Sequence, residues 1–486
     1  MSRPSVVIVG GGISALAAAW ELTGGAAGPT EVTPRVELIE ASERLGGSLA
    51  TGEFAGRTID LGADGVLARR PEATTLVHEL EWAERLEAIG ASGASLWLGG
   101  ALHDIPAGLA LGVPTSSAMV RALGGLSWRA RLAARRDERL PRRLIVGEDA
   151  TIGEIVRTKL GRELAYQFVE PMIGGIQAGR IDQLSARSVF PALLTAAHEG
   201  GSLMRALAQF GPVNPGPAAP TVASTPLFTS LLSGLGSLPG ELARQLQLRG
   251  VVLRTGAPVR ALHQSRDGAY RWTVDTETTT TPANAVVMAT PAVVVDQLLG
   301  HLDDDLAALG TVTSAATATV TFCYARADLT LPPHGTGVLV PLATPWRGDG
   351  TMMVTALTLL DRKWPHLARD QDVIVRAHVG RSDDQRWASL GDDALIERVG
   401  AELGVLLDSH AARRDARVQR WLPGLPQYLV GHEVLVAHAR AAAAHIRVTL
   451  CGNTYDGVGV PACIGSGRRA AREVLALLHD SGSVTE

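Results

Sequence analysis

The chain begins with a hydrophobic run that turns abruptly into glycine. Val6–Val9 are all apolar and β-branched, and such a run without polar alternation predicts a strand buried on both faces of a parallel sheet. Gly10, Gly11 and Gly12 follow at once, and Leu16–Leu22 has the composition of a helix. This order predicts a strand–turn–helix unit whose helix N-terminus can bind an anion.

The glycine turn fits the dinucleotide-binding pattern Gly-x-Gly-x-x-Ala, with Ala15 in the last position. Gly10 permits the tight turn, Gly12 lets a pyrophosphate approach the backbone, and Ala15 lets the helix lie close to the strand. A purely structural turn is the alternative. A second predicted strand ends in Glu40, whose carboxylate can accept both hydroxyls of an adenosine ribose, and this favours the dinucleotide site. A predicted loop at Thr23–Pro34 accounts for the large number of residues between the glycine turn and Glu40.

The hydrophobic periodicity changes further along the chain. Residues 71 to about 209 are mostly helical in pattern, but Glu170–Gly179 breaks it, and the glycine density there predicts a backbone packed against something large. Ala285–Met288 is a buried strand that we assign to the first sheet again. Residues 310–420 predict an antiparallel sheet with a helix at Asp392–Leu407. Its expected strands are Thr317–Tyr324, Thr351–Thr358 and Val373–Val379.

The last segment has the same order of strand, glycine-rich turn and helix as the first. Val448–Val460 predicts a strand running into a glycine-rich turn, and Ile464–Leu478 predicts a helix that opens there. Gly211–Pro226 is rich in Pro, Ala and Thr and predicts a surface loop or linker. The expected fold class is therefore α/β with α+β elements. The predicted domains are a discontinuous Rossmann-like dinucleotide-binding domain (1–70, 225–310 and 420–486), a mainly helical domain (71–224) and an antiparallel β domain (311–419).

Length, charge and cysteine content limit the number of domains, the partners and the cellular compartment to be expected. A length of 486 residues suffices for two or three domains, and the net charge of −4 argues against a nucleic-acid partner. Cys323, Cys451 and Cys463 are too few and too far apart for a disulfide framework or a metal cluster, so we expect buried thiols in a reducing compartment. No secretory segment and no apolar run long enough to span a bilayer occur. We expect a cytoplasmic protein with at most peripheral membrane contact.

Several motifs together resemble the flavin-dependent oxidases of the amine oxidase superfamily. They are Gly10–Ala15, Glu40, Arg44–Gly47, Gly62–Gly65 and Gly452–Cys463. Finer motifs are similar to the protoporphyrinogen/coproporphyrinogen oxidase family of haem synthesis, and this resemblance covers essentially the whole chain. The finer motifs are Val169–Gly179, Leu235–Pro239, Gly335–Pro341 and Tyr455–Ile464.

The resemblance implies a non-covalent FAD. By position, the glycine turn would hold the pyrophosphate, residues near Glu40 the ribose and adenine, and the remaining segments the flavin end. The implied contacts are Gly10, Gly11, Gly12, Ile13, Ser14, Ala15, Glu40, Ala41, Arg44, Gly47, Ser48, Gly62, Ala63, Asp64, Gly65, Val259, Trp421, Asn453, Val458, Gly459 and Val460. The chain departs from the family at Ser48, where a basic or aromatic residue is common, at Ala15 and at Ala63.

The resemblance also implies a reaction, the oxygen-dependent dehydrogenation of a porphyrinogen. The flavin would take a hydride from a bridging carbon while a pyrrole N–H loses a proton, in three two-electron rounds, and the protein supplies orientation and a dry cavity. Gly93–Leu96 lacks the arginine that eukaryotic protoporphyrinogen oxidases place before Trp97–Gly100. This favours coproporphyrinogen III over protoporphyrinogen IX as substrate, with an iron chelatase as the partner that receives the product.

Candidate substrate residues follow from the propionates of such a substrate, which favour arginine contacts. Arg69 and Arg70 are candidates, with a solvated helix start as the alternative, and Gly175 and Ile176 are further candidates within a family motif. Asp64 allows two interpretations. It caps the nearby helix or orders its own turn, or it hydrogen-bonds a pyrrole N–H and assists proton loss with a pKa raised by burial.

Two other functions stay open from the sequence. One is a different flavin enzyme, such as an amine oxidase or a carotenoid desaturase. The chain has only six Phe and five Tyr, which argues against the aromatic cage that amine oxidases of this superfamily often use. The other is a non-catalytic protein that binds FAD or a porphyrin.

Overall fold

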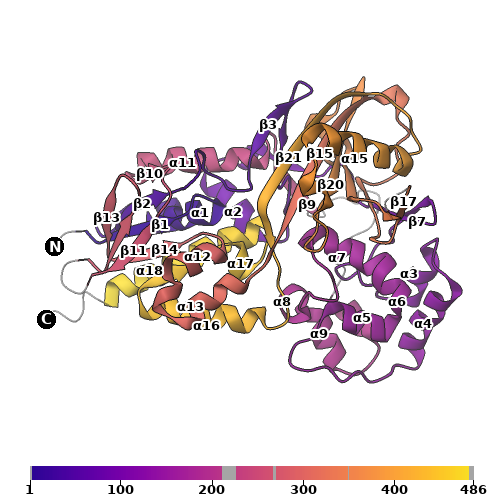
Figure 1. Ribbon diagram of the computed structural model, residues 1–486, viewed down its shortest axis with the longest axis horizontal. Coiled ribbons are helices and arrows are strands. Elements are labelled where there is room, and N and C mark those ends of the chain that lie inside the picture. Colours follow the sequence, from indigo (N-terminus) through magenta and orange to yellow (C-terminus); the bar gives the residue numbers. More distant parts are fainter. Residues whose placement is uncertain (1–2, 211–225, 266–269, 348–349, 481–486) are drawn as a thin grey trace.

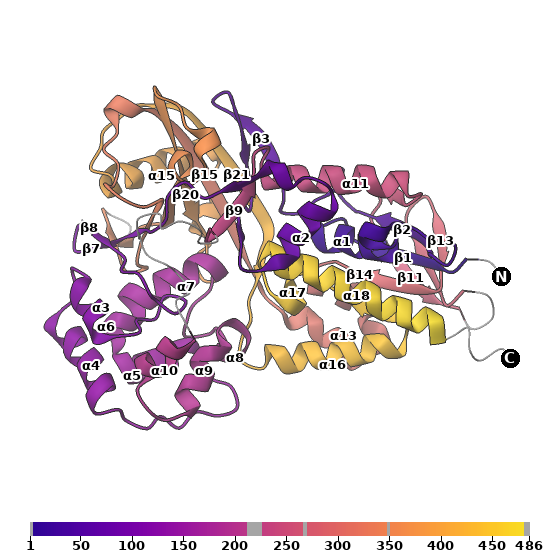
Figure 2. The ribbon, with the colours of Figure 1, turned by 180° about the vertical axis from the view of Figure 1, so that it is seen from behind.

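The molecule has a helix-covered parallel sheet at one end and an antiparallel sheet beside a group of short helices at the other (Figures 1 and 2). The computed structural model describes residues 3–210, 226–265, 270–347 and 350–480. The loop predicted at Gly211–Pro226 lies, except for its last residue, outside the described residues. The mixed α/β class predicted from the periodicity is confirmed by these layers.

The parallel sheet takes its strands from distant parts of the chain. Its order is β10 (Val252–Arg254), β2 (Arg35–Ile39), β1 (Ser5–Val9), β14 (Ala285–Met288) and β22 (Val448–Leu450). Because side chains alternate along a strand, Val6 and Ile8 enter one hydrophobic core and Val7 and Val9 enter another on the opposite face. The prediction that residues 285–288 return to the first sheet is confirmed by the pairing of β14 with β1.

Helices cover both faces of this sheet, as a sheet buried on both sides requires. The helices α1 (Ile13–Leu22), α11 (Leu238–Leu248) and α18 (Val460–Asp480) pack on one face, and α12 (Ala292–Leu299) and α16 (His432–His445) pack on the other. The last helix starts at Val460, four residues before the predicted start. It crosses α1 so closely that a Cβ on Gly467 would lie 2.0 Å from the carbonyl oxygen of Ser14.

The antiparallel sheet has seven strands. Their order is β21 (Arg413–Pro426), β15 (Ser314–Ala325), β20 (Asp372–Val379), β19 (Val354–Leu359), β16 (Gly337–Leu339), β7 (Ser95–Leu98) and β8 (Ala101–Asp104). Val375 and Ala377 of β20 pack with the hydrophobic side of helix α15 (Asp392–Leu406), whereas Ile374 belongs to a separate cluster on the opposite face. The intervening residues of β20, Arg376 and His378, therefore face away from α15. The predicted strands and helix of this region are confirmed, with shifted ends.

The expectation of a mostly helical stretch from 71 to 209 is wrong for residues 95–104. These residues form β7 and β8, and β7 pairs in parallel with β16, with Val338 opposite Ser95. Four-residue strands are too short for their alternation to be distinguished from part of a helix, so the partner strand decides their conformation.

The expected break at Glu170–Gly179 is also wrong, because Glu170–Gln177 is helix α7. Pro171 lies in its first turn, where a proline is tolerated. The glycines admit a neighbour, since a Cβ on Gly174 would lie 3.0 Å from Nη1 of Arg381. The other helices of this part are α3 (Ser117–Ala122), α4 (Trp128–Arg139), α5 (Ile152–Leu160), α6 (Arg162–Leu164), α8 (Ala186–Val189), α9 (Pro191–His198) and α10 (Leu203–Gln209).

Candidate active site

The glycine turn after β1 has the backbone that its sequence predicts. Gly10 has φ +107°, and a Cβ there would lie 2.5 Å from the carbonyl oxygen of Ala289, so only glycine fits. Gly12 is the N-cap of α1, offers no side chain to the first turn, and would point a Cβ into open space. The amide groups of Ile13 and Ser14 in that turn are thus available to an anion from outside.

A second loop lies against this turn. The amide of Gly46 donates to the carbonyl of Gly11 at 2.8 Å, and Arg44 Nη1 donates to the carbonyl of Leu49 at 3.1 Å. These bonds place Gly46 and Gly47 beside Gly12, since Gly46 pairs with Gly12 in a short bridge and a Cβ on Gly47 would lie 3.4 Å from the Cα of Gly12.

Glu40 lies at the carboxyl end of β2, next to the exposed Ala41. Its Oε2 accepts from the amide of Gly11 at 2.5 Å, and its Oε1 accepts from the amide and hydroxyl of Ser42 at 2.8 and 2.7 Å. The amide of Ala257, two residues before Val259, donates to the carbonyl of Glu40 at 2.9 Å. The predicted ribose and adenine contacts therefore lie in one corner.

The loop at residues 62–65 is enclosed by two tryptophans. A Cβ on Gly62 would lie 2.0 Å from the carbonyl oxygen of Ser48 and 3.1 Å from the ring of Trp421. A Cβ on Gly65 would lie 2.7 Å from the ring of Trp364. The structure thus joins Ser48, the loop and Trp421, which are far apart in sequence, on one wall that also includes Ala63.

The turn between β22 and α18 supplies further predicted site residues. The carbonyl of Asn453 accepts from the hydroxyl of Tyr428, and Val458 and Gly459 lead directly into Val460, the first residue of α18. Cys463 lies in the first turn of this helix, where its amide donates to Gly459 at 3.0 Å. Burial raises the pKa of this thiol to about 11 and that of Cys451 to about 12, so both stay protonated at neutral pH.

The structure contradicts two parts of what was predicted for Asp64, the helix cap and the raised pKa. Helix α2 (Pro71–Glu79) begins at the N-cap Arg70 with no side-chain cap, so Asp64 does not cap it. Its Oδ1 accepts from Lys363 Nζ at 2.8 Å, and its Oδ2 lies 3.7 Å from Arg376 Nη1. Burial alone raises the pKa of Asp64, but the cations Lys363 and Arg376 lower it to about 2. The expected raised pKa is wrong, and a carboxylate this acidic is a poor proton acceptor.

Three side chains around Asp64 escaped the sequence reasoning. Lys363 follows β19, Arg376 and His378 lie on the side of β20 that faces away from α15, and burial together with Arg376 lowers the pKa of His378 to about 4. The sequence held one signal: Lys363 is one of two lysines in a chain whose other basic residues are arginines. Asp60 also belongs here, because burial raises its pKa to about 6 while the amides of residues 235 and 236 donate to it.

The predicted substrate residues lie in two separate places, unlike the predicted cofactor residues. Arg69 and Arg70 are exposed, and Arg70 Nη2 bonds Glu72 at 2.7 Å, as the solvated alternative predicts. Gly175 and Ile176 lie on the exposed side of α7, where a Cβ on Gly175 would lie 3.8 Å from Leu339 of β16. Their contact with a substrate stays a prediction.

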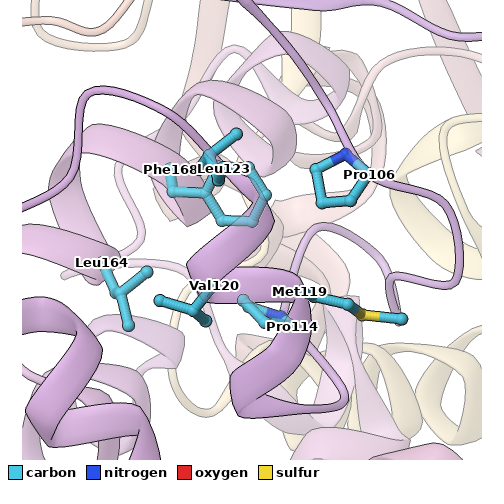
Figure 3. Close-up of a pocket in the computed structure, with 7 residues that line it drawn as sticks. All are labelled: Pro106, Pro114, Met119, Val120, Leu123, Leu164 and Phe168. Atoms are coloured by element: carbon cyan, nitrogen blue, oxygen red, sulfur yellow. The ribbon is translucent and has the colours of Figure 1, made fainter.

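A small apolar pocket inside the helical part is unrelated to this site (Figure 3). It has no titratable side chain and too little room for a water molecule. Its lining is Pro106, Pro114, Met119, Val120, Leu123, Leu164 and Phe168. Within the described part of the chain, no cluster of three His, Cys, Asp or Glu side chains suits a metal ion, and no helix has the length and hydrophobicity to cross a bilayer.

Comparison with known proteins agrees with this arrangement. The chain belongs to the family of flavin containing amine oxidoreductases, whose model matches residues 13–475. It is 31% identical to the coproporphyrinogen III oxidase of Bacillus subtilis (strain 168) and 33% identical to that of Mycobacterium leprae (strain TN), in each case over 98% of this chain and 99% of the relative. A crystal structure from Exiguobacterium sp. 255-15, provisionally described as a protoporphyrinogen oxidase, has a TM-score of 0.84 at 30% identity, covering 98% and 100% of the two chains.

Membership of this family makes the protein a flavin-dependent oxidoreductase. The predicted resemblance and the predicted enzyme class are therefore confirmed.

Replacing Glu40 with alanine tests the ribose corner. The substitution removes a charge-assisted acceptor worth about 1.5–3 kcal/mol, so we expect the affinity of apoprotein for FAD to fall about 10- to 100-fold. The measurement is a fluorescence titration of FAD. Glu43→Ala, an exposed carboxylate in the same loop, is the control and should bind FAD as the unmodified protein does. An unchanged dissociation constant in Glu40→Ala would place the ribose elsewhere.

Proposed function

We propose that the protein is an FAD-dependent oxidase that converts coproporphyrinogen III to coproporphyrin III with molecular oxygen as the acceptor. The observation that carries this proposal is full-length similarity to relatives named for that reaction, at 31% and 33% identity. Protoporphyrinogen IX is the second candidate substrate, favoured by the description of the Exiguobacterium structure.

The cradle described above fits an FAD. The uncapped N-terminus of α1 and the open face of Gly12 would take the pyrophosphate, and Glu40 the ribose. The wall formed by Gly62, Ala63 and Trp421 would face the flavin end. When bound, the flavin supplies the acceptor for a hydride, and the protein's task is to position the substrate and exclude water.

Asp64 would serve as a fixed hydrogen-bond acceptor for the substrate. The pyrrole N–H groups of a porphyrinogen are donors, and the carboxylate of Asp64 can accept from them. Lys363 and Arg376 keep this carboxylate ionised and hold it in place, with Asp64 only 16% and Lys363 19% exposed at their side chains. Asp64 therefore orients the macrocycle and stabilises positive charge on it, without taking up the proton.

The test of this function is an anaerobic–aerobic comparison with both porphyrinogens. Purified protein loaded with FAD should bleach when mixed anaerobically with coproporphyrinogen III and regain its colour in air, with porphyrin fluorescence appearing at the same rate. Protoporphyrinogen IX should react with a lower kcat/KM. Bleaching by amines or carotenoids but by neither porphyrinogen would assign a different flavin enzyme, and FAD binding without any bleaching would indicate a carrier.

We expect the FAD to be non-covalent. Covalent attachment to cysteine needs a thiolate, and the buried Cys451 and Cys463 stay protonated because burial raises their pKa values to about 12 and 11. Acid precipitation should release all of the yellow colour into the supernatant. Flavin that remains in the washed pellet would contradict this expectation.

The contacts of Asp64 with Lys363 and Arg376 predict how kcat/KM depends on pH. Since the native pKa of Asp64 is about 2, the carboxylate stays ionised at all pH values above about 4, and its titration should not appear in the profile of kcat/KM between pH 5 and 9. Lys363→Met removes the first cation that lowers this pKa, so burial should raise it and kcat/KM should fall on the acid side. Asp64→Asn should lower kcat/KM about 10- to 100-fold at every pH.

Two outcomes would contradict the assigned role of Asp64. One is full activity of Asp64→Asn, which would remove the residue from substrate binding. The other is an acid-side inflection in the unmodified protein that disappears in Asp64→Asn, which would restore it as a proton acceptor.

A further inference from the structure

A buried arginine at the end of β20 has no partner. Arg381 is 1% exposed, yet none of its guanidinium nitrogens donates a hydrogen bond to a described residue, and Nε and Nη1 are fully enclosed. Its neighbour Ser382 also has an enclosed hydroxyl without a partner. Unpaired buried charges are costly and rare in folded proteins. We call Arg381 and Ser382 the Arg381 corner.

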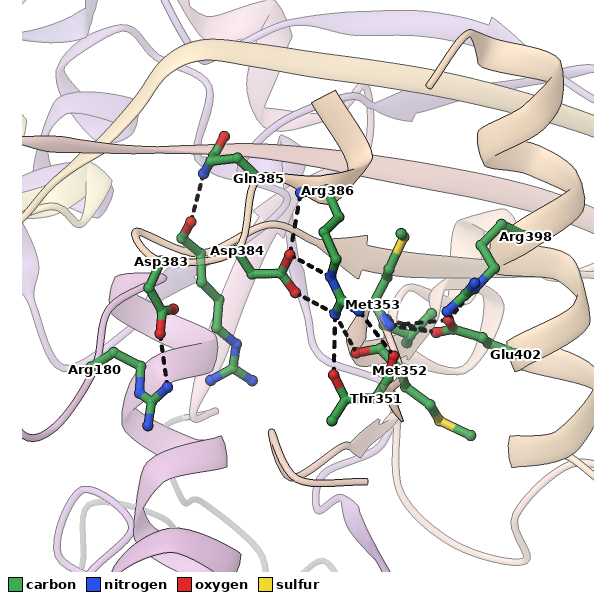
Figure 4. Close-up of polar contacts among 12 residues, drawn as sticks. Arg180, Thr351, Met352, Met353, Asp383, Asp384, Gln385, Arg386, Arg398 and Glu402 are labelled. Carbon is green, nitrogen blue, oxygen red and sulfur yellow. Dashed lines mark hydrogen bonds and ion pairs between the residues drawn. The ribbon is translucent and has the colours of Figure 1, made fainter. Parts of the chain in front are cut away.

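The nearby carboxylates are engaged with other arginines. Arg180 bonds Glu170 at 2.7 Å and Asp383 at 2.8 Å, so it holds both carboxylates. Figure 4 shows its bond to Asp383. Arg386 bonds Asp384 through its Nε and Nη2 at 2.9 and 2.7 Å. Within the part of the chain that the structure describes, no carboxylate lies within ion-pair distance of the guanidinium of Arg381. Its neighbours therefore leave a cation available for an anion from outside.

The backbone fixes the corner in this place. Gly380 has φ +97°, and a Cβ there would lie 2.6 Å from the indole nitrogen of Trp387, so glycine is required where the chain leaves β20. The turn directs Arg381 against Gly174 of α7, where the missing side chain leaves room for the guanidinium. The amide of Ser382 donates to the carbonyl of Ala178 at 2.8 Å and ties the corner to the end of α7.

An open pocket of about 540 Å³ borders the corner. Ser382 lines it together with other uncharged polar side chains, among them Gln183, Ser314 and Gln427. Leu429 and Val430 add apolar surface to the lining. A pocket of this mixed lining beside an unpaired cation is suited to an acidic group on an otherwise apolar ligand.

β20 connects this corner to the candidate active site. Arg376 on the same strand touches Asp64, and Arg381 follows five residues later. The strand ends at Val379, and Arg381 lies just beyond the turn at Gly380, so one continuous segment joins the corner to the residue that contacts Asp64. Ile176, a predicted substrate residue, is 50% exposed on α7, the helix that packs against Arg381 through Gly174.

We propose that the Arg381 corner is a carboxylate subsite that binds one propionate of the substrate through the guanidinium of Arg381 and the hydroxyl of Ser382. The inference rests on the proposed function for the source of the carboxylate. Coproporphyrinogen III carries four propionates and protoporphyrinogen IX carries two, so a further carboxylate subsite favours the former. Guanidinium binds carboxylate with two parallel hydrogen bonds, which makes arginine the suitable residue.

The test compares Arg381→Met with a matched variant of the same loop, Arg386→Met. Binding of the product coproporphyrin III is followed by fluorescence quenching, which needs no turnover, and thermal unfolding gives Tm. We expect Arg381→Met to bind coproporphyrin III about 10-fold or more weakly, with little change for protoporphyrin IX, and to keep its Tm because its guanidinium makes no hydrogen bond or ion pair with a described residue. Arg386→Met should lower Tm and leave the ratio of the two affinities unchanged.

Several outcomes would overturn the subsite. They are unchanged coproporphyrin III affinity in Arg381→Met, an equal loss for both porphyrins, or a loss of Tm as large as in Arg386→Met. If sodium propionate alone raises Tm through Arg381 while porphyrin affinity is unaffected, the corner binds small carboxylates and not the substrate. Arg381→Lys, which keeps the charge but not the paired hydrogen bonds, should show an intermediate affinity if Arg381→Met fails to fold.

The failure of this inference is distinct from the failure of the proposed function. Unmodified protein that neither binds nor oxidises either porphyrinogen would overturn the function itself. Normal turnover together with an unaffected Arg381→Met would overturn the subsite alone.

Discussion

Buried cations of the antiparallel sheet hold the loop at residues 60–65, and the candidate active site depends on these contacts. Arg376 donates to the carbonyl of Asp60 and, at 3.5 Å, to that of Gly62, while Lys363 bonds the carboxylate of Asp64. Arg57, one strand earlier, pairs with Asp372 at the start of β20. Each bond joins residues about 300 positions apart in sequence, so the loop acquires its shape only when the sheet is in place.

The same contacts set the electrostatics of the site. A buried carboxylate is normally protonated more easily than a free one, yet two cations reverse this for Asp64 and lower its pKa to about 2. Asp60 lies four residues away with backbone amides as its donors, and burial prevails there and raises its pKa to about 6. Two neighbouring aspartates therefore differ because one has cations and the other has dipoles as partners.

Arg381, two residues beyond the end of β20, shows the opposite arrangement. Arg376 donates hydrogen bonds to the carbonyls of Asp60 and Gly62, whereas the equally buried guanidinium of Arg381 donates none to any described residue. Glu170 would be its natural counter-ion, but Arg180 occupies that carboxylate and burial still raises the pKa of Glu170. A strand with an ion-paired guanidinium, followed after its end by an unpaired one, is suited to a ligand with acidic groups at its edge.

The sequence by itself determined the elements whose residues satisfy local rules. Gly10 is required by the backbone of the turn, Gly12 leaves the face of the turn open, Val6–Val9 alternate between two cores, and the period-two strands of 310–420 form the antiparallel sheet. The division into domains and the individual cofactor contacts stay predictions from that sequence. Its pattern also indicated a large neighbour at the glycines of 170–179, which is Arg381 at Gly174.

Only the tertiary structure decided the rest, because it depends on partners that no local pattern names. Residues 95–104 are strands because β16 offers them an edge, and Glu170–Gln177 is a helix because its glycines are needed for packing rather than for a turn. The pKa of Asp64 depends on Lys363, 299 residues away, and the availability of Arg381 depends on which carboxylates other arginines have taken. Charge–charge contacts depend on distance in space, and a sequence specifies that distance only through the whole fold.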